Sequence, residues 1–420
     1  MKPKLLSILP HYSLPQFRAD AWAGVTVAMV AIPLSIAIAI ASGAPPATGL
    51  ITAIIGGLLI SLLGGSRVQI GGPTGAFIVI VYGVIVAHGY AGLVLATLMA
   101  GIILVVAGLL RAGNLIAFVP EAVINGFTIG IGIIIGSSQL KDFLGLTADH
   151  VPADFLPKIA ALWAARHTLN PAALGTGVVA LGLILALRRL FPRLPGLIVA
   201  IGVVSGAVWA LHLPVDTIAS RYGALPARLP MPVLPPLSLA RVEELLPSAL
   251  VIAFLAGVES LLSAMVADRL IESRHRPNAE LLAQGFANIG SALFGGLPAT
   301  GAIARTATNV GAGGRTPIAG IVHAGVILLV LLLAAPLAGF MVMPALAALL
   351  LSAAWNMSEP HKWRHYWAQP LAHRALLLIT LALTVLSNLT IAIGVGVALG
   401  LLLRWREKGT GAAEWSEPKH

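Results

Sequence analysis

Two ionisable side chains lie in stretches of the sequence that are otherwise apolar, and both residue types can do chemistry there. Glu259 has Ser260 beside it and Ser263 one helical turn further on, and Arg305 follows Thr300 by about one turn. A desolvated guanidinium can bind an anion, and a desolvated carboxylate can carry a proton or, with hydroxyl oxygens, hold a sodium ion. Structural roles are the alternative, with Arg305 paired to a carboxylate and Glu259 paired to Arg305 or to backbone donors.

Each half of the chain contains a glycine-rich motif, and the two motifs are similar. Gly71–Ala76 reads Gly-Gly-Pro-Thr-Gly-Ala, and Gly295–Ala302 reads Gly-Gly-Leu-Pro-Ala-Thr-Gly-Ala. The similarity indicates an internal repeat. Neither motif continues into the Gly-Lys-Ser/Thr of a phosphate-binding loop, which argues against nucleotide-driven pumping. The residues that end both motifs are Thr74, Gly75 and Ala76 in the first and Thr300, Gly301 and Ala302 in the second.

The composition of the chain is that of a membrane protein. Its 420 residues are 58% hydrophobic and 10% charged, with a mean hydropathy of +0.94, whereas about a quarter of the residues in soluble chains are charged. The 45 glycines and 28 prolines favour close helix contacts and broken helices in the bilayer. The absence of cysteine excludes disulfides, thiol catalysis and thiolate metal sites. We therefore predict an all-α polytopic membrane protein in a lipid bilayer.

About 14 transmembrane segments are predicted from the apolar runs, because a membrane helix needs about 20 mainly apolar residues. They are Ala21–Ala41, Thr48–Leu63, Thr74–Ala87, Gly92–Leu110, Ile116–Gly136, Pro171–Leu187, Gly196–Leu211, Pro247–Ala267, Leu281–Phe294, Gly301–Val310, Pro317–Leu333, Pro344–Met357, Leu371–Leu386 and Thr390–Leu403. The third and tenth are too short for one crossing, which is typical of the discontinuous helices of transporters. Because the two motifs precede equivalent segments, we predict a 7+7 inverted repeat.

The distribution of positive charge predicts the orientation. An even number of spans puts both termini on one side, and most of the 26 lysines and arginines fall on that side. The positive-inside rule then predicts cytoplasmic termini, and the net charge of +10 needs no nucleic acid as partner. The chain divides into a cytoplasmic lead-in, residues 1–20, a transmembrane transport domain, residues 21–404, and a short cytoplasmic tail, residues 405–420.

The inverted repeat predicts where a ligand binds. Two inverted broken helices place their N-termini, at Thr74 and Thr300, opposite one another near the bilayer midplane. Each N-terminus has unpaired backbone N–H groups and about half a positive charge, so the gap between them is an anion site. Arg305 adds a full charge close to that gap. We therefore expect a small anion as the ligand, with no cofactor and no enzyme activity.

Two other polar residues have structural interpretations. Glu280 stands near a predicted helix start, where a carboxylate caps unpaired N–H groups. Asn288 is interpreted as a hydrogen bond between helices. Neither residue is predicted to touch a ligand.

Several ordered motifs resemble those of the SulP sulfate-permease family of anion transporters. They are Ala23–Pro33, Gly64–Ala76, Phe118–Gly130, Gln284–Asn288 and Gly295–Gly314. The resemblance extends over nearly all of residues 15–404. It implies a fourteen-span inverted-repeat fold in which a core domain moves against a gate domain, and a homodimer.

The resemblance also implies roles for individual residues. The substrate would contact Thr74–Ala76 and Thr300–Ala302 with Arg305 close behind, and Glu259 would occupy the acidic position used for cation coupling, beside Ser260 and Ser263. Sodium-coupled members tend to have an aspartate and extra hydroxyls at the cation. Glu259 and the apolar Ile303 therefore favour a co-transported proton, with sodium as the alternative.

The sequence differs from the family pattern in two places, in the first span and after the last span. Many members have Pro-Gln followed by a tyrosine in the first span, but this chain has Pro33, Leu34 and then Ile38, which resembles the bicarbonate-transporting branch. A cytoplasmic STAS domain usually follows the last span, and here Arg404–His420 leaves no room for one.

We therefore expect a proton-coupled symporter of small anions in the inner (plasma) membrane, working by alternating access. Sulfate is the first candidate, followed by bicarbonate and a dicarboxylate. An anion channel on the same scaffold and a nucleobase-type permease of the same fold are the alternatives. The permease reading would require a carboxylate in the tenth span, where this sequence has Arg305.

Overall fold

The computed structural model describes residues 2–114, 120–148, 151–191, 195–387 and 389–409. Residues 410–420 of the predicted tail and residues 118–119 of one family motif lie outside the described residues. Residues 405–409 of the predicted tail belong to the last helix, which ends at Gly409.

The described residues form helices almost throughout. The helices are α1 (Leu5–Ile8), α2 (Leu14–Ala41), α3 (Pro46–Leu63), α4 (Ile78–Leu109), α5 (Glu121–Leu144), α6 (Phe155–Ala164), α7 (Pro171–Leu190), α8 (Gly196–Ala210), α9 (Ile218–Tyr222), α10 (Leu239–Ile271), α11 (Pro277–Leu293), α12 (Ile303–Gly311), α13 (Ile318–Gly339), α14 (Met343–Met357), α15 (Trp363–Ala368), α16 (Leu371–Leu386) and α17 (Leu389–Gly409). Two short strands, β1 (Gly71–Gly72) and β2 (Thr300–Gly301), pair with each other.

Every predicted span overlaps one of these helices, but the helices differ in length. In the described part of the chain, seven are long and apolar enough to cross a membrane: α2, α3, α4 with its preceding 3-10 turn, α5, α7, α10 and α13. Several others, such as α8 and α16, are apolar but shorter. Because length and composition identify seven crossings, the count of fourteen spans stays a prediction.

The third and fourth predicted spans correspond to two helical stretches of α4 that meet at Gly89. A 3-10 turn, Gly75–Phe77, leads into α4, and the backbone of α4 leaves the helical conformation at Gly89, where φ is 71° and ψ is 176°. Glycine adopts positive φ without the steric cost that a Cβ brings. The break lies between the segments that the sequence separates, Thr74–Ala87 and Gly92–Leu110.

The predicted lead-in, residues 1–20, is partly helical. α2 begins at Leu14 because Ser13 and Gln16 form a capping box. Asp20 is fully buried and accepts hydrogen bonds from the backbone N–H groups of Arg315 and Thr316. The start of α2 is thereby fixed to the segment that enters α13.

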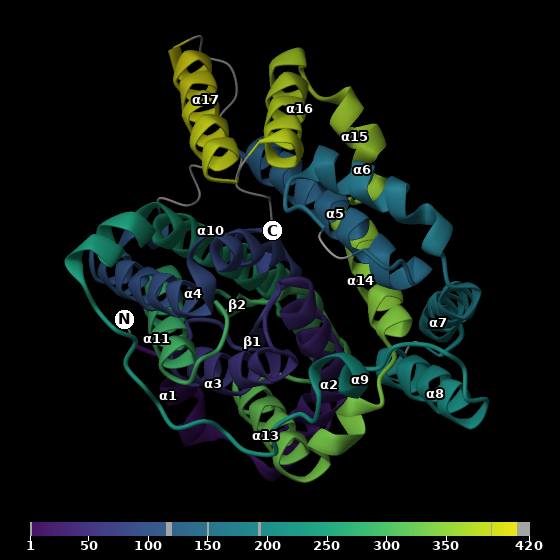
Figure 1. Cartoon of the computed structure of the whole chain (residues 1–420). Coiled ribbons are helices and arrows are strands. Elements are labelled where there is room, and N and C mark those ends of the chain that lie inside the picture. The colour runs from purple at the N-terminus through teal and green to yellow at the C-terminus, as the bar shows by residue number, and fades with distance from the viewer. Residues whose placement is uncertain (1, 115–119, 149–150, 192–194, 388, 410–420) are drawn as a thin grey trace.

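The helices form two groups (Figure 1). In the first, α11 packs on α3 and α4, α13 packs on α2 and α3, α10 packs on α4 and α12, and the strand pair lies among them. In the second, α14 packs on α5 and α7, α16 packs on α5 and α17, and α7 packs on α8. Contacts of α2 with α8 and α14 join the two groups.

Candidate functional site

The two glycine-rich motifs meet in the first group of helices. β1 and β2 pair antiparallel, with Gly71 opposite Gly301 and Gly72 opposite Thr300. The N–H of Ala302 donates to the carbonyl of Ile70 over 2.8 Å and continues the pairing. Segments about 230 residues apart in the sequence therefore lie side by side, and a helix starts directly after each.

Both helix starts have backbone N–H groups that no side chain caps. The turn that leads into α4 begins after Thr74, and α12 begins after Ala302, and neither of these residues makes a capping bond with its side chain. Gly75 and Ala76 are half-buried, whereas Thr300 is fully buried and its hydroxyl donates to the carbonyl of Ala256 over 3.0 Å. Helix starts in this state attract negative charge.

Arg305 brings a buried cation to the same place. Its side chain is 1% exposed, and its Nη2 donates to the carbonyl of Pro73 over 3.0 Å and to the Ser35 hydroxyl over 3.2 Å. Its Nε and Nη1 have no hydrogen-bond partner among the described residues. No carboxylate in that part of the chain lies within 4.0 Å of the guanidinium. Arg305 and Glu259 therefore form no direct ion pair in the described part of the chain, although the charge of Glu259 acts on Arg305 from a longer distance.

Gly72 leaves room for the guanidinium. A Cβ at this position would lie 2.3 Å from Arg305 Nη1, and the φ of Gly72 is +149°, a conformation that L side chains rarely adopt. Both facts require glycine at this point of β1. The unpartnered side of the guanidinium thus lies against the backbone that joins the two motifs.

Glu259, on α10, lies against the first helix start. The Thr74 hydroxyl donates to Glu259 Oε2 over 2.8 Å, and the Glu259 side chain is half-buried. Thr74, predicted as a substrate contact, and Glu259, predicted as the coupling carboxylate, are therefore direct neighbours.

The two serines assigned with Glu259 point to other partners. Ser260 Oγ accepts from Gln69 Nε2 over 2.8 Å and donates to Glu280 Oε1 over 3.1 Å. Ser263 Oγ lies 3.3 Å from the hydroxyl of Thr306. Neither serine is joined to the Glu259 carboxylate by a hydrogen bond in the described part of the chain. The residues that the structure describes also contain no group of three or more histidines and carboxylates that could hold a metal ion.

Glu280 has a different role from the predicted cap. It is fully buried in the first turn of α11, but α11 has no side-chain cap. Its carboxylate accepts from the backbone N–H groups of Gly65 and Ser66 at 2.8 and 3.1 Å, from Ser260 Oγ, and from Gln284 Nε2 at 2.8 Å. The capping interpretation is wrong because the loop after α3 folds over Glu280 and supplies its buried donors.

Asn288 fixes the chain just before β2. Its Nδ2 donates to the carbonyl of Ala299 over 2.8 Å, and its Oδ1 accepts from the N–H of the same residue over 3.0 Å. The predicted hydrogen bond between helices is therefore a bond between a helix and the glycine-rich segment. Glu280, Gln284 and Asn288 are spaced four residues apart, so one face of α11 holds both the loop after α3 and the approach to β2.

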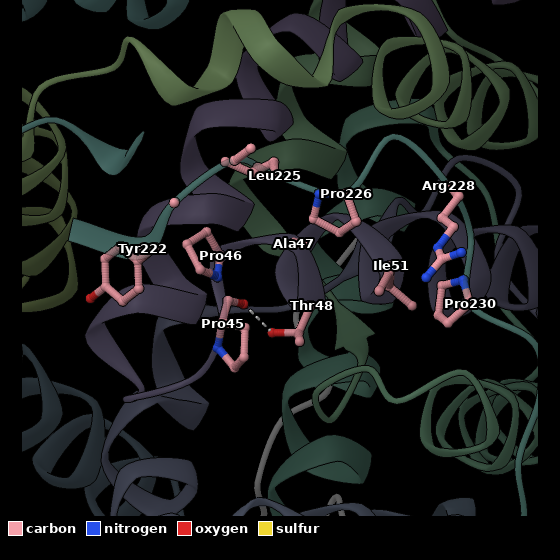
Figure 2. Close-up of a pocket in the computed structure, with 12 residues that line it drawn as sticks. Pro45, Pro46, Ala47, Thr48, Ile51, Tyr222, Leu225, Pro226, Arg228 and Pro230 are labelled. Carbon is pink, nitrogen blue, oxygen red and sulfur yellow. Dashed lines mark hydrogen bonds between the residues drawn. The ribbon is translucent and has the colours of Figure 1, made fainter. Parts of the chain in front are cut away.

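A pocket of about 340 Å³ lies away from this site, at the start of α3 and along the segment after α9 (Figure 2). Its lining is mostly proline and aliphatic, with Tyr222 at one end and Arg228 at the other. None of the predicted substrate or coupling residues lines it. We therefore locate the candidate site by the buried polar groups around Arg305 and not by this pocket.

Comparison with known proteins identifies the relatives of this chain. The model of the sulfate permease family matches residues 17–381. A Bacillus subtilis protein named "Putative sulfate transporter YvdB" is 45% identical over 394 residues, which are 93% of this chain and 73% of that protein. The bicarbonate transporter BicA of a Picosynechococcus species is 32% identical over 403 residues, covering 92% of this chain and 70% of BicA.

Solved structures agree with these matches. The transmembrane domain of a cyanobacterial bicarbonate transporter BicA superposes with a TM-score of 0.80 at 29% identity, covering 93% of this chain and 98% of that domain. The structure of SLC26A9 superposes with a TM-score of 0.87, but its 19% identity shows a shared fold alone. The family motifs, the match over residues 17–381 and these relatives all lead to the same result. This chain belongs to the sulfate permease family of membrane anion transporters.

Proposed function

We propose that this chain is a secondary active transporter that carries a small anion together with a proton by alternating access. The observation that carries the proposal is Arg305, a buried cation without a carboxylate partner, at the meeting point of two uncapped helix starts. We infer that a substrate anion pairs with this guanidinium.

The energetics of Arg305 favour an anion at this place. Removing a guanidinium from water costs several kcal/mol, and a structure recovers that cost when hydrogen bonds satisfy all of its donors. Here Nη2 is satisfied by Pro73 and Ser35, while Nε and Nη1 are not. An oxyanion would accept from these nitrogens and from the N–H groups of Gly75, Ala76 and the start of α12. Thr74, Thr300, Gly301 and Ala302 would shape the same site.

The substrate order remains sulfate, then bicarbonate, then a dicarboxylate. Sulfate is supported by the family and by the printed name of the Bacillus relative, and bicarbonate is supported by the likeness to BicA. Backbone N–H groups and a guanidinium recognise negative charge but accept several oxyanion shapes. The site by itself therefore selects an anion and leaves its geometry open.

Glu259 is the proposed proton carrier. Its carboxylate accepts a hydrogen bond from the hydroxyl of Thr74, a predicted substrate contact. An anion that binds to Thr74 would therefore act directly on the Glu259 carboxylate. A protonated Glu259 removes one negative charge that would repel the anion. Because Ser260 and Ser263 bond to Gln69, Glu280 and Thr306, they offer less to a sodium ion, which supports a proton as the coupling ion.

The architecture we propose has fourteen spans in a 7+7 inverted repeat over residues 21–404. The first group of helices would act as the core and the second as the gate. We further propose a homodimer in the inner (plasma) membrane with both termini in the cytoplasm. The Gly89 break in α4 and the short α12 support discontinuous third and tenth spans.

Uptake into proteoliposomes tests the function. Labelled sulfate is offered with an inward proton gradient, with a sodium gradient or with neither, and unlabelled bicarbonate and fumarate serve as competitors. We expect proton-stimulated accumulation that Arg305→Ala abolishes and that Arg241→Ala, a change at an exposed arginine, preserves. Large currents without accumulation would identify a channel instead. Normal uptake by Arg305→Ala would refute the assignment of this site.

A further inference from the structure

His323 is a second buried ionisable group close to the candidate site, and the mechanism above does not use it. It lies on α13, its side chain is 0% exposed, and both Nδ1 and Nε2 have no hydrogen-bond partner in the part of the chain that the structure describes. A neutral imidazole has one donor and one acceptor, and burying both unpaired is costly. An imidazole in this state needs a function or a partner that arrives with the ligand.

The glycines of α3 and β1 place His323 near Arg305. A Cβ at Gly57 would lie 3.0 Å from the carbonyl oxygen of Gly71 and 3.8 Å from His323 Cε1. Gly72, the next residue, has the Arg305 guanidinium against it. The imidazole therefore lies beside Gly57, which contacts β1 at Gly71, and the guanidinium lies against the next residue of β1, Gly72.

The hydroxyl of Ser61 is a further buried polar group in the interface of α3 and α13. Ser61 lies one turn after Gly57 on α3, and a Cβ at Gly320, about one turn before His323 on α13, would lie 2.0 Å from Ser61 Oγ. Ser61 is 4% exposed, and its hydroxyl also has no partner among the described residues. Ser61 therefore lies against Gly320 in the interface of α3 and α13, about one turn away from His323.

Few charges act on His323 from the elements around it. α13 packs against α2, α3 and α9. α3 has no titratable side chain, Arg18 of α2 is exposed, and Asp20 of α2 is bonded to the backbone at the entry to α13. Arg221 of α9 is paired with two aspartates. The charge that acts on His323 is that of Arg305, and this repulsion disfavours a proton on the imidazole until an anion neutralises Arg305.

We propose that His323 is the site that distinguishes divalent from monovalent anions, because it binds one proton when a dianion occupies the Arg305 site and stays neutral when a monoanion does. The proposal rests on the anion transport proposed above. With Glu259 protonated, Arg305 alone neutralises a monoanion. A dianion leaves one negative charge unbalanced, and a proton taken from solution onto a nitrogen of His323 balances it. An N–H bond forms on the ring, and no other bond changes.

Proton uptake on binding measures this directly. The purified chain in detergent is mixed with sulfate or nitrate in weakly buffered solution that contains a pH indicator, and the number of protons taken up per bound anion is recorded. Nitrate is a monovalent oxyanion, and neither anion titrates near neutral pH. We expect sulfate to bring one more proton than nitrate, and we expect His323→Gln to remove that extra proton. The matched control is His365→Gln, a change at an exposed histidine.

The affinity for sulfate gives a second readout. One linked proton changes the Kd about tenfold per pH unit, so His323→Gln should reduce the slope of log Kd against pH by about one for sulfate and leave it unchanged for nitrate. Equal proton uptake with both anions in the unmutated chain would overturn the proposal and requires no variant to fold. An unchanged sulfate slope in a folded His323→Gln would overturn it as well. If neither anion binds the unmutated chain, the proposed function itself fails.

Discussion

Replacing Arg305 with methionine separates a functional cation from a structural one. Methionine retains the apolar length of the side chain and removes the charge, so the cavity left behind is small. A buried charge pair that loses one partner typically costs about 2–5 kcal/mol of binding free energy. We therefore expect the Kd for sulfate to rise by about 30-fold to a few thousand-fold, since about 1.4 kcal/mol is a factor of ten.

The stability of the same variant should change little. The carbonyl of Pro73 and the Ser35 hydroxyl lose a donor, and an unpaired buried acceptor costs about 1–3 kcal/mol. Removal of a desolvated charge with two unsatisfied nitrogens recovers a similar amount, because apolar replacements of buried ions are often neutral or stabilising by about 1–4 kcal/mol. The expected signature is a large loss of affinity with Tm shifted by a few degrees at most.

Titration calorimetry and a thermal melt of the purified variant in detergent measure the two quantities. Arg305→Lys is the intermediate case, because it keeps the charge but loses the forked donor geometry. A Kd within about threefold of the unmutated value would refute the reasoning. A strongly lowered Tm with unchanged affinity would make Arg305 a structural residue.

Three further changes test separate parts of the site. Glu259→Gln should leave anion binding intact and make sulfate uptake independent of an imposed proton gradient, and gradient-driven accumulation by this variant would contradict a coupling role. Gly72→Ala should weaken sulfate binding at least tenfold, since its Cβ would lie 2.3 Å from Arg305 Nη1, and Gly83→Ala, where a Cβ meets open space, is the matched control. Glu280→Ala should lower Tm clearly, because its four buried donors lose their acceptor, and an unchanged Tm would show that this carboxylate is dispensable.

The sequence predicts the helices well because lipid constrains them strongly. In a bilayer each backbone group must be satisfied within its own segment, so apolar runs become helices wherever they occur. The likeness of the two glycine-rich motifs also predicts that both take part in one structure, and β1 and β2 do pair. Helix starts are harder to predict from hydropathy. α2 begins at Leu14, before the predicted Ala21, because Ser13 and Gln16 form a polar cap that a hydropathy profile does not detect.

Side-chain partners could be predicted only in part. The spacing of Glu280, Gln284 and Asn288 signals a polar face on α11, but the loop and strand that this face holds come from distant parts of the chain. Ser260 follows Glu259 directly, so the helix turns it to another face, where its hydroxyl bonds to Glu280. Ser263 lies one turn after Glu259 on the same face, but its hydroxyl lies 3.3 Å from that of Thr306, a partner from a distant part of the chain that spacing along α10 does not reveal. His323 gives no signal at all, since a single histidine in an apolar helix acquires its surroundings only from packing on α3.

The protonation of side chains near Arg305 is the feature by which this site can distinguish one anion from another. Backbone N–H groups and the guanidinium of Arg305 attract any small oxyanion, and Thr300 is engaged by the carbonyl of Ala256. Contacts of this kind accept both tetrahedral sulfate and planar bicarbonate, so the difference in charge between the two anions is the feature left for the site to recognise. Glu259 and His323 are the two groups near Arg305 that can change the total charge by one proton each. Such a transporter would distinguish anions by the number of protons that bind to Glu259 and His323 together with each anion. Its preference among substrates would therefore shift with pH.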